Sequence, residues 1–204
     1  MMFKKNYFQI IKSAISKEKA EFVFNYFNLY KDRITLLLDK RFIPFHDSVY
    51  GNWNDGQSKN AFYCYADPAM EVLLQECKSL LEKQIKIKLI ETYSYARIYQ
   101  KGSELKKHTD RPSCAISCTM NLGGDVWPIF LKDKKGKTNK VNLKQGDLLI
   151  YKGCELEHWR EEFTGDNCTQ VFLHYVEDNI KNKKLKWDTR PGLGLPSDFK
   201  NKDV

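Results

Sequence analysis

Two hydrophobic patterns divide the chain near Ile87. Before that point, apolar residues recur every three to four positions in two stretches, and this spacing predicts two amphipathic helices. The first helix is expected over residues 17–31, with Ser16 as its N-cap. The second is expected to begin at Asp67-Pro68, because aspartate accepts hydrogen bonds from the first N–H groups of a helix and proline suits the first helical position. The N-terminal part is therefore expected to be helical.

After Ile87 the hydrophobic period falls to two, which is typical of strands. Turns that contain glycine separate these stretches, so each strand is short. The expected strands are 87–100, 114–122, 126–131, 138–143, 147–152, 156–161 and 169–177. This pattern predicts an α+β, mainly β fold: a double-stranded β-helix, or jelly roll, with the N-terminal helices packed on one sheet.

The chain is expected to form one domain followed by a tail. Its length of 204 residues suits a single core. We assign residues 1–180 to this domain, with a helical part at 1–86 and a jelly-roll part at 87–180. Residues 181–204 form a basic C-terminal tail without a clear period, and we expect this tail to be poorly ordered or loosely packed.

Composition narrows the class of protein without selecting a function. Hydrophobic residues make up 42% of the chain and charged residues 29%, which excludes wholesale disorder. No apolar stretch reaches the roughly 18 residues of a membrane span, and the N-terminal stretch lacks the features of a secretion signal. We therefore expect a cytoplasmic protein with no membrane partner.

The net charge of +8 comes largely from lysines in Lys132–Lys144 and in the tail. A basic excess favours contact with anions, but lysines in loops and tails most often only keep a protein soluble. The charge therefore does not choose between functions.

Six cysteines could form three disulfides, but without a secretion signal we expect reduced thiols. There is no CxxC pair, and no histidine stands at zinc-finger spacing from Cys114 and Cys118. We interpret all six as small core or pocket-wall residues. They are Cys64, Cys77, Cys114, Cys118, Cys154 and Cys168.

The candidate chemistry rests on two of the four histidines. His108 and Asp110 form an HxD sequence, and residues two apart in an extended chain project to the same side, so both can bind one ion. His158 lies on a later predicted strand, which a jelly roll can bring beside the first. Two histidines and a carboxylate on one face of an ion are typical of non-haem Fe(II) oxygenases. The alternatives are a surface turn pair at HxD and a structural role for His158; we interpret His46 and His174 as structural.

A longer pattern surrounds the HxD sequence. A tyrosine, a glycine and a leucine precede it at steps of three residues, and a hydrophobic strand, a Gly-Gly turn, a Gly-Asp turn and a second histidine follow it. These positions are Tyr99, Gly102, Leu105, His108, Asp110, Cys114–Leu122, Gly123-Gly124, Gly146-Asp147 and His158. In this order, residues 93–177 resemble the prolyl 4-hydroxylase-like branch of the 2-oxoglutarate/Fe(II)-dependent dioxygenases. The helical part shows no such resemblance.

The resemblance implies a role for each matching residue. The implied catalytic residues, which are also the Fe(II) ligands, are His108, Asp110 and His158. Tyr99 would hydrogen-bond the co-substrate, 2-oxoglutarate. Ser117 and Asn121 fall where the family contacts the distal carboxylate of this co-substrate, and their spacing lets them share one face of a strand.

One departure from the family concerns the cation that pairs with that carboxylate. The family places a lysine or arginine on the strand after the distal histidine, but the corresponding stretch 167–170 has no cation. A buried carboxylate needs a charged or multiply hydrogen-bonded partner. Arg160 is the first candidate, because on a strand it faces the same side as His158. Arg97 is the second and Gln170 the third; alternatively a different oxo-acid, or none, binds there.

The resemblance implies an Fe(II)- and 2-oxoglutarate-dependent oxygenase that uses O₂, releases succinate and CO₂, and hydroxylates an organic substrate. A prolyl residue in a peptide or protein is the first substrate to consider, and a small molecule is the other. Loops such as 45–60 and 101–107 would set this choice. Whether turnover also needs ascorbate stays open.

Three other functions compete with the oxygenase that the resemblance implies. Nucleic acid is not an expected partner, because the demethylase branch carries two arginines after the distal histidine and residues 161–178 contain none. A non-catalytic jelly-roll binding module would use the basic surface instead. A cupin-like enzyme that uses zinc or manganese would use the same ligands for another reaction.

Overall fold

Two antiparallel sheets face each other in the computed structural model, which describes residues 2–45, 48–53 and 56–200. The larger sheet has the strand order β1-β8-β5-β10-β3-β2, and the smaller has the order β4-β9-β6-β7. The strands of the larger sheet are β1 (Phe8–Ile11), β2 (Ala61–Tyr65), β3 (Leu89–Tyr99), β5 (Ile116–Gly124), β8 (Leu148–Tyr151) and β10 (Cys168–Glu177). Those of the smaller sheet are β4 (Leu105–His108), β6 (Ile129–Lys132), β7 (Thr138–Val141) and β9 (His158–Arg160).

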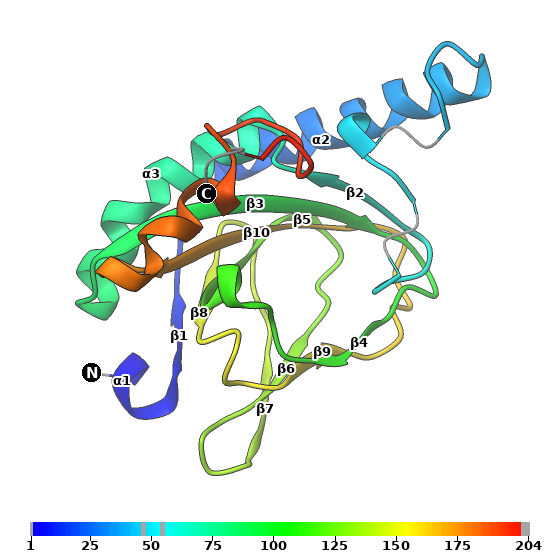
Figure 1. Cartoon of the computed structure of the whole chain (residues 1–204). Helices are drawn as coiled ribbons and strands as arrows, with labels where there is room; N and C mark the ends of the chain where they lie inside the picture. Colours follow the sequence, from blue (N-terminus) through cyan, green and yellow to red (C-terminus); the bar gives the residue numbers. More distant parts are fainter. Residues whose placement is uncertain (1, 46–47, 54–55, 201–204) are drawn as a thin grey trace.

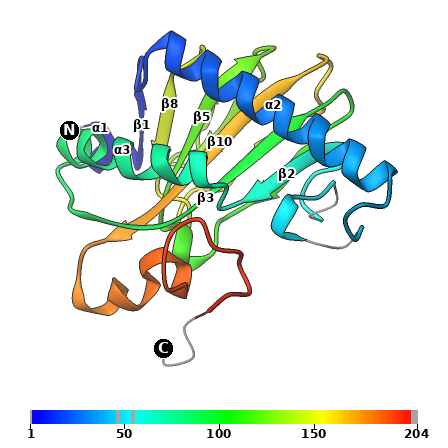
Figure 2. The ribbon, with the colours of Figure 1, turned by 90° about the horizontal axis from the view of Figure 1, so that it is seen from above.

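Two long helices cover the outer face of the larger sheet, whereas the smaller sheet lies on its other side (Figures 1 and 2). These two helices are α2 (Lys17–Asp39) and α3 (Pro68–Ile85). A third helix, α1 (Met2–Asn6), is short. Short 3₁₀ segments occur at Ser48–Tyr50, Pro112–Cys114 and Ile180–Thr189. Ser16 caps α2 by accepting a hydrogen bond from the Lys19 N–H, and Asp67 caps α3 through the N–H groups of Ala69 and Met70.

The main hydrophobic core lies between these helices and the larger sheet. Phe27 of α2, Leu74 and Leu81 of α3, and Leu173 of β10 are fully buried there. Because helices cover one face of β5 and β10 and the smaller sheet covers the other, nearly every residue of these two strands is buried. The polar residues that face the smaller sheet are therefore inside the protein, where they can form a site.

The predicted jelly roll with helices on one sheet is confirmed, and each of the seven expected strands is present. Three strands were missed: β1, β2 and β4. They have four or five residues each, too few for a period of two to stand out. The first long helix is longer than expected, because its hydrophobic pattern continues to Asp39.

The expectation of a loosely packed tail is wrong for residues 181–200. Arg190 and Asp188 are buried, and the 3₁₀ segment packs on β3. Ion pairs of Asp188 and Arg190, which a hydrophobic period does not reveal, hold this part of the chain. Residues 201–204 and His46 lie outside the described residues.

Candidate active site

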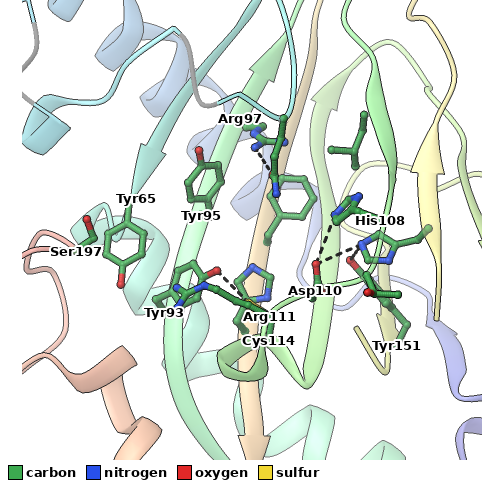
Figure 3. A pocket seen from close by; sticks show the side chains of 16 residues that line it. Tyr65, Tyr93, Tyr95, Arg97, His108, Asp110, Arg111, Cys114, Tyr151 and Ser197 are labelled. Atoms are coloured by element: carbon green, nitrogen blue, oxygen red, sulfur yellow. Dashed lines mark hydrogen bonds and ion pairs between the residues drawn. The ribbon is translucent and has the colours of Figure 1, made fainter. Parts of the chain in front are cut away.

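The HxD sequence and the distal histidine meet on the smaller sheet. β4 ends at His108 and β9 begins at His158, and the two histidines are direct partners in the antiparallel pairing of these strands. Their ring centroids lie 4.3 Å apart. Asp110 follows two residues after His108 and turns its carboxylate toward both rings (Figure 3).

The three side chains present one donor atom each to a common point. Asp110 Oδ1 lies 3.6 Å from His108 Nε2 and 3.5 Å from His158 Nε2, and the three ligand atoms lie within 4.8 Å of one another. His108 Nδ1 lies 2.7 Å from the Lys106 carbonyl oxygen, and His158 Nδ1 lies 2.9 Å from that of Leu156. A carbonyl only accepts, so each Nδ1 carries the proton and each Nε2 keeps a lone pair for a metal.

This donor set suits Fe(II). Two neutral imidazoles and one carboxylate on one side of an ion leave its other positions open, which is the facial arrangement of non-haem iron sites. Burial would raise the pKa of the Asp110 carboxyl, but the two histidine rings that face it hold this pKa well below its usual range. The carboxylate is therefore ionised and ready to bind a cation.

Further contacts fix the orientation of Asp110. Its second oxygen, Oδ2, accepts a hydrogen bond of 2.5 Å from Ser117 Oγ, and its backbone N–H donates to the Gly153 carbonyl oxygen at 2.9 Å. A Cβ atom on Gly153 would lie 2.2 Å from Asp110 Oδ2. Only glycine therefore leaves room for the carboxylate in this orientation. The role of Gly153 was missed, because nothing in a Lys-Gly turn marks such an approach.

His174 extends this chain of contacts from β10. Its Nδ1 lies 3.0 Å from Ser117 Oγ, and the single Ser117 hydroxyl proton has two acceptors, Asp110 Oδ2 and the Cys114 carbonyl. His174 Nδ1 therefore donates to Ser117. Burial lowers the pKa of His174 to about 4, so this ring is neutral at pH 7. The interpretation of His174 as purely structural is incomplete, because its ring also lines the cavity beside the metal ligands.

A cavity of about 470 Å³ opens beside the candidate metal ligands. Aromatic rings of the larger sheet form its opposite wall (Figure 3): Tyr65, Tyr93 and Tyr95 line it, and Tyr65 stacks on Tyr93 at 4.9 Å between centroids. Tyr151 lines the cavity from the metal side, with its hydroxyl 3.4 Å from His158 Nε2. The volume is that of a ligand pocket for one small molecule or one side chain.

The two candidate arginines occupy different places. Arg97 lines the cavity, with its guanidinium 5.0 Å from the Tyr95 ring centroid, and donates to Gln57 Oε1 at 2.8 Å. Arg160 lies deeper between the sheets and is 1% exposed. It points toward Thr119 Oγ1 at 3.5 Å and Gln170 Oε1 at 3.3 Å, and also donates to the Trp127 carbonyl.

Arg160 does not line the cavity, and its co-substrate role stays a prediction, which its surroundings favour. Its hydrogen bonds among the described residues all go to neutral acceptors, and its buried Nε has no hydrogen-bond partner among them. A buried cation surrounded only by neutral groups is costly unless an anion is supplied. On β9 the side chains of His158 and Arg160 project from the same face, and their Cα atoms are about 7 Å apart. A five-carbon dicarboxylate can bridge this separation.

The other expected co-substrate residues lie inside the barrel but do not line the cavity. Tyr99 is fully buried and its hydroxyl lies 3.3 Å from Arg97 Nη1. Ser117 contacts the metal ligand Asp110, as described above. The Asn121 amide donates to the Leu143 carbonyl at 2.9 Å, away from the metal ligands. The co-substrate roles of Tyr99, Ser117 and Asn121 therefore stay predictions.

The cysteines divide into two groups. Five are buried, and Cys114 among them lines the cavity, 3.0 Å from the Tyr93 hydroxyl. Cys154 is exposed, so the interpretation as a core or pocket residue is wrong there. In the part of the chain that the structure describes, no helix combines the length and apolar character needed to cross a membrane.

Comparison by sequence alone identifies no relative. No family model matches the chain, and no curated protein matches it. Comparison by structure finds many similar folds.

Three solved structures illustrate the similarity. A Pseudomonas putida prolyl-4-hydroxylase has a TM-score of 0.64 at 10% identity, over 87% of this chain and 96% of that chain. A Trichoplax adhaerens prolyl hydroxylase, in complex with a hypoxia inducible factor peptide fragment, has a TM-score of 0.64 at 13% identity, over 87% of this chain and 86% of that chain. HygX from Streptomyces hygroscopicus, with nickel, 2-oxoglutarate and hygromycin B bound, has a TM-score of 0.59 at 12% identity, over 85% of this chain and 84% of that chain. The chain therefore has the fold of the 2-oxoglutarate/Fe(II) oxygenases, and it carries a His-Asp-His site that suits Fe(II).

Proposed function

We propose that this protein is an Fe(II)- and 2-oxoglutarate-dependent oxygenase that hydroxylates an organic substrate. One observation carries the proposal: His108, Asp110 and His158 turn three donor atoms to one point beside a cavity, in a fold that such enzymes share. Iron held there, together with 2-oxoglutarate and O₂, supplies oxidative decarboxylation to succinate and CO₂ coupled to hydroxylation of a C–H bond. The protein's own residues have three tasks around this chemistry.

The first task is to hold the metal in one geometry. The carbonyls of Lys106 and Leu156 fix the protonation of the two imidazoles, and Ser117 fixes the carboxylate. Such supporting contacts raise metal affinity and keep ligand atoms from turning away. Because these partners belong to the backbone and to a buried serine, the site is preorganised.

The second task is to bind the co-substrate. Arg160 would pair with its distal carboxylate, with Thr119 and Gln170 as neutral hydrogen-bonding neighbours. A charge-assisted pair inside the barrel is strong because water does not compete for it. Arg97 is the alternative partner, since it lines the cavity directly.

The third task is to place one C–H bond of the substrate beside the metal and to exclude water. The tyrosine wall formed by Tyr65, Tyr93 and Tyr95 gives a flat apolar surface that suits a ring. We take a prolyl residue in a peptide or protein as the first substrate to test. A small ring-bearing molecule is the other class that a cavity of about 470 Å³ accommodates.

Release of succinate from 2-oxoglutarate tests this proposal. The purified protein is supplied with Fe(II), 2-oxoglutarate and O₂, with and without ascorbate, against proline-containing peptides, the same peptides with alanine for proline, free amino acids and small ring compounds. We expect succinate that depends on 2-oxoglutarate, increases with one of these classes, and is absent in His108→Ala. Succinate at the same level in His108→Ala, or none with any member of the panel, would overturn the proposal.

A further inference from the structure

The chain after β10 returns to the cavity. In Figure 2 this segment, orange to red, runs from the end of β10 along β3. The 3₁₀ segment Ile180–Thr189 packs on β3, and Ser197 lines the cavity opposite the metal ligands. The C-terminal segment therefore supplies part of the cavity surface.

Two ion pairs attach this segment: one is buried and lies away from the cavity, and the other joins a buried aspartate to a half-exposed arginine beside the cavity. Arg190 pairs with Glu71 of α3 at 3.2 Å, with side chains 0% and 2% exposed, and Gly194 N–H donates to the same carboxylate at 2.8 Å. Neither Arg190 nor Glu71 lines the cavity. This pair fixes the segment to the helical layer.

The second pair joins the segment to the loop that carries the metal ligand. Asp188 accepts two hydrogen bonds from Arg111, at 2.9 and 2.7 Å, and one from the Tyr65 hydroxyl at 2.7 Å. Arg111 is the residue directly after Asp110. Its guanidinium lies 4.6 Å from the centroid of the Tyr93 ring, so it forms part of the tyrosine wall.

The backbone around Asp188 needs these contacts. Trp187, Asp188 and Thr189 have φ angles of 52°, 56° and 66°, a left-handed conformation that residues other than glycine adopt at a cost. Three such residues in succession persist only where surrounding interactions hold them. The Asp188 carboxylate supplies bonds to Arg111 and Tyr65, and Lys200 and Arg190 donate to the backbone carbonyls of Asp188 and Trp187.

We propose that residues 186–200 form the substrate-side wall of the cavity and that Asp188 is a positioning residue, which holds this wall closed by fixing Arg111 on Tyr93. The cavity and its wall do not depend on any reaction; that the occupant of the cavity is the substrate rests on the proposed function. Without the Asp188 carboxylate the left-handed turn loses its bonds to Arg111 and Tyr65, and the wall beside Ser197 opens to water.

The accessibility of the Cys114 thiol shows whether this wall is closed. It lines the cavity, is 3% exposed, and touches Tyr93, the ring on which Arg111 lies. Cys77 and Cys118 lie in the core on the other face of the larger sheet, equally buried. Local opening of the wall exposes Cys114 alone, whereas general loss of stability exposes all three.

The test measures N-ethylmaleimide labelling of each cysteine in the full chain by peptide mapping. In Asp188→Asn, a substitution that left-handed backbone tolerates, we expect Cys114 labelling to rise about tenfold while Cys77 and Cys118 stay unchanged. Asp147→Asn is the matched control, because Asp147 is also 3% exposed and also pairs with a basic side chain, Lys12, at 2.7 Å, but it does not line the cavity. In that control we expect no selective change at Cys114.

A second comparison asks whether Asp188 acts through Arg111. Arg111→Gln should raise Cys114 labelling as Asp188→Asn does, and combining both should add nothing further. Unchanged Cys114 labelling in Asp188→Asn, or an equal rise at all three cysteines, overturns the proposed wall. Because labelling needs neither metal nor turnover, it separates failure of the wall from failure of the oxygenase proposal, which succinate release tests.

Discussion

The two ends of the barrel interior are built differently. At the metal end, His108, Asp110 and His158 each have a hydrogen-bonding partner from the protein that orients the donor atom. At the arginine end, Arg160 lies among neutral groups, and its Nε has no partner among the described residues. The comparison teaches that the chain alone orients the three candidate metal ligands, whereas at the arginine end it leaves a buried cation that, in the function we propose, an anion would pair with.

The largest effect should come from removing the positive charge at the arginine end. Arg160→Met should raise the apparent 2-oxoglutarate constant about 50-fold, since a hydrogen-bonded charge pair contributes about 1.5–3 kcal/mol. Arg97→Met, the matched control on the cavity wall, should raise it only a few-fold. Succinate release at varied 2-oxoglutarate measures both constants. Equal effects of the two substitutions would contradict the assignment of the distal carboxylate of 2-oxoglutarate to Arg160. A larger effect of Arg97→Met would assign that carboxylate to Arg97.

A second effect concerns the neutral histidine behind the metal end. Burial lowers the pKa of His174 to about 4, below the usual value of 6.5. Its contribution to stability is therefore fully present above pH 6.5 and is lost as pH falls from 6.5 toward 4, because the unfolded state binds the proton first. Between pH 7 and pH 5 this loss should be about 2 kcal/mol.

His174→Gln should lack that part of the pH dependence, because glutamine does not titrate. Urea unfolding of both proteins at pH 7 and pH 5, with a chelator present so that metal does not contribute, measures the difference. If both proteins lose the same stability between these pH values, His174 is not buried as a neutral ring.

The smallest effect should come from Ser117, the serine that links Asp110 to His174. Ser117→Ala should weaken Fe(II) binding about tenfold, because Asp110 loses the bond that orients it, and should leave the 2-oxoglutarate constant nearly unchanged. Titration with Fe(II) under anaerobic conditions measures the first quantity and succinate release the second. A raised 2-oxoglutarate constant with normal iron affinity would instead give Ser117 the co-substrate role that the resemblance implies.

The metal end could be predicted from the sequence because its determinants are local. The spacing of His108 and Asp110 and the turns before His158 predict strands that a jelly roll brings together, and the register of β4 and β9 then pairs the two histidines. Ser16 and Asp67 likewise identify the starts of both long helices. A cap or a two-residue spacing can be recognised without knowledge of the rest of the fold.

The remaining features depend on contacts between distant segments. The bond of Ser117 to Asp110, the approach of Gly153 and the pairing of Arg111 with Asp188 involve loop geometry that no period encodes. The C-terminal segment was mistaken for a loose tail for this reason: charged side chains attach it, and a basic, aperiodic sequence resembles one that has no partner. Sequence reasoning located the metal centre, and only the structure revealed the groups that hold it.

The central claim is that His108, Asp110 and His158 hold Fe(II) for reaction with 2-oxoglutarate. Its most direct test is the visible absorption spectrum of the protein after anaerobic addition of Fe(II) and 2-oxoglutarate. We expect a weak charge-transfer band that needs both additions and is absent in His108→Ala. No band in the native protein, or an unchanged band in His108→Ala, would contradict the claim.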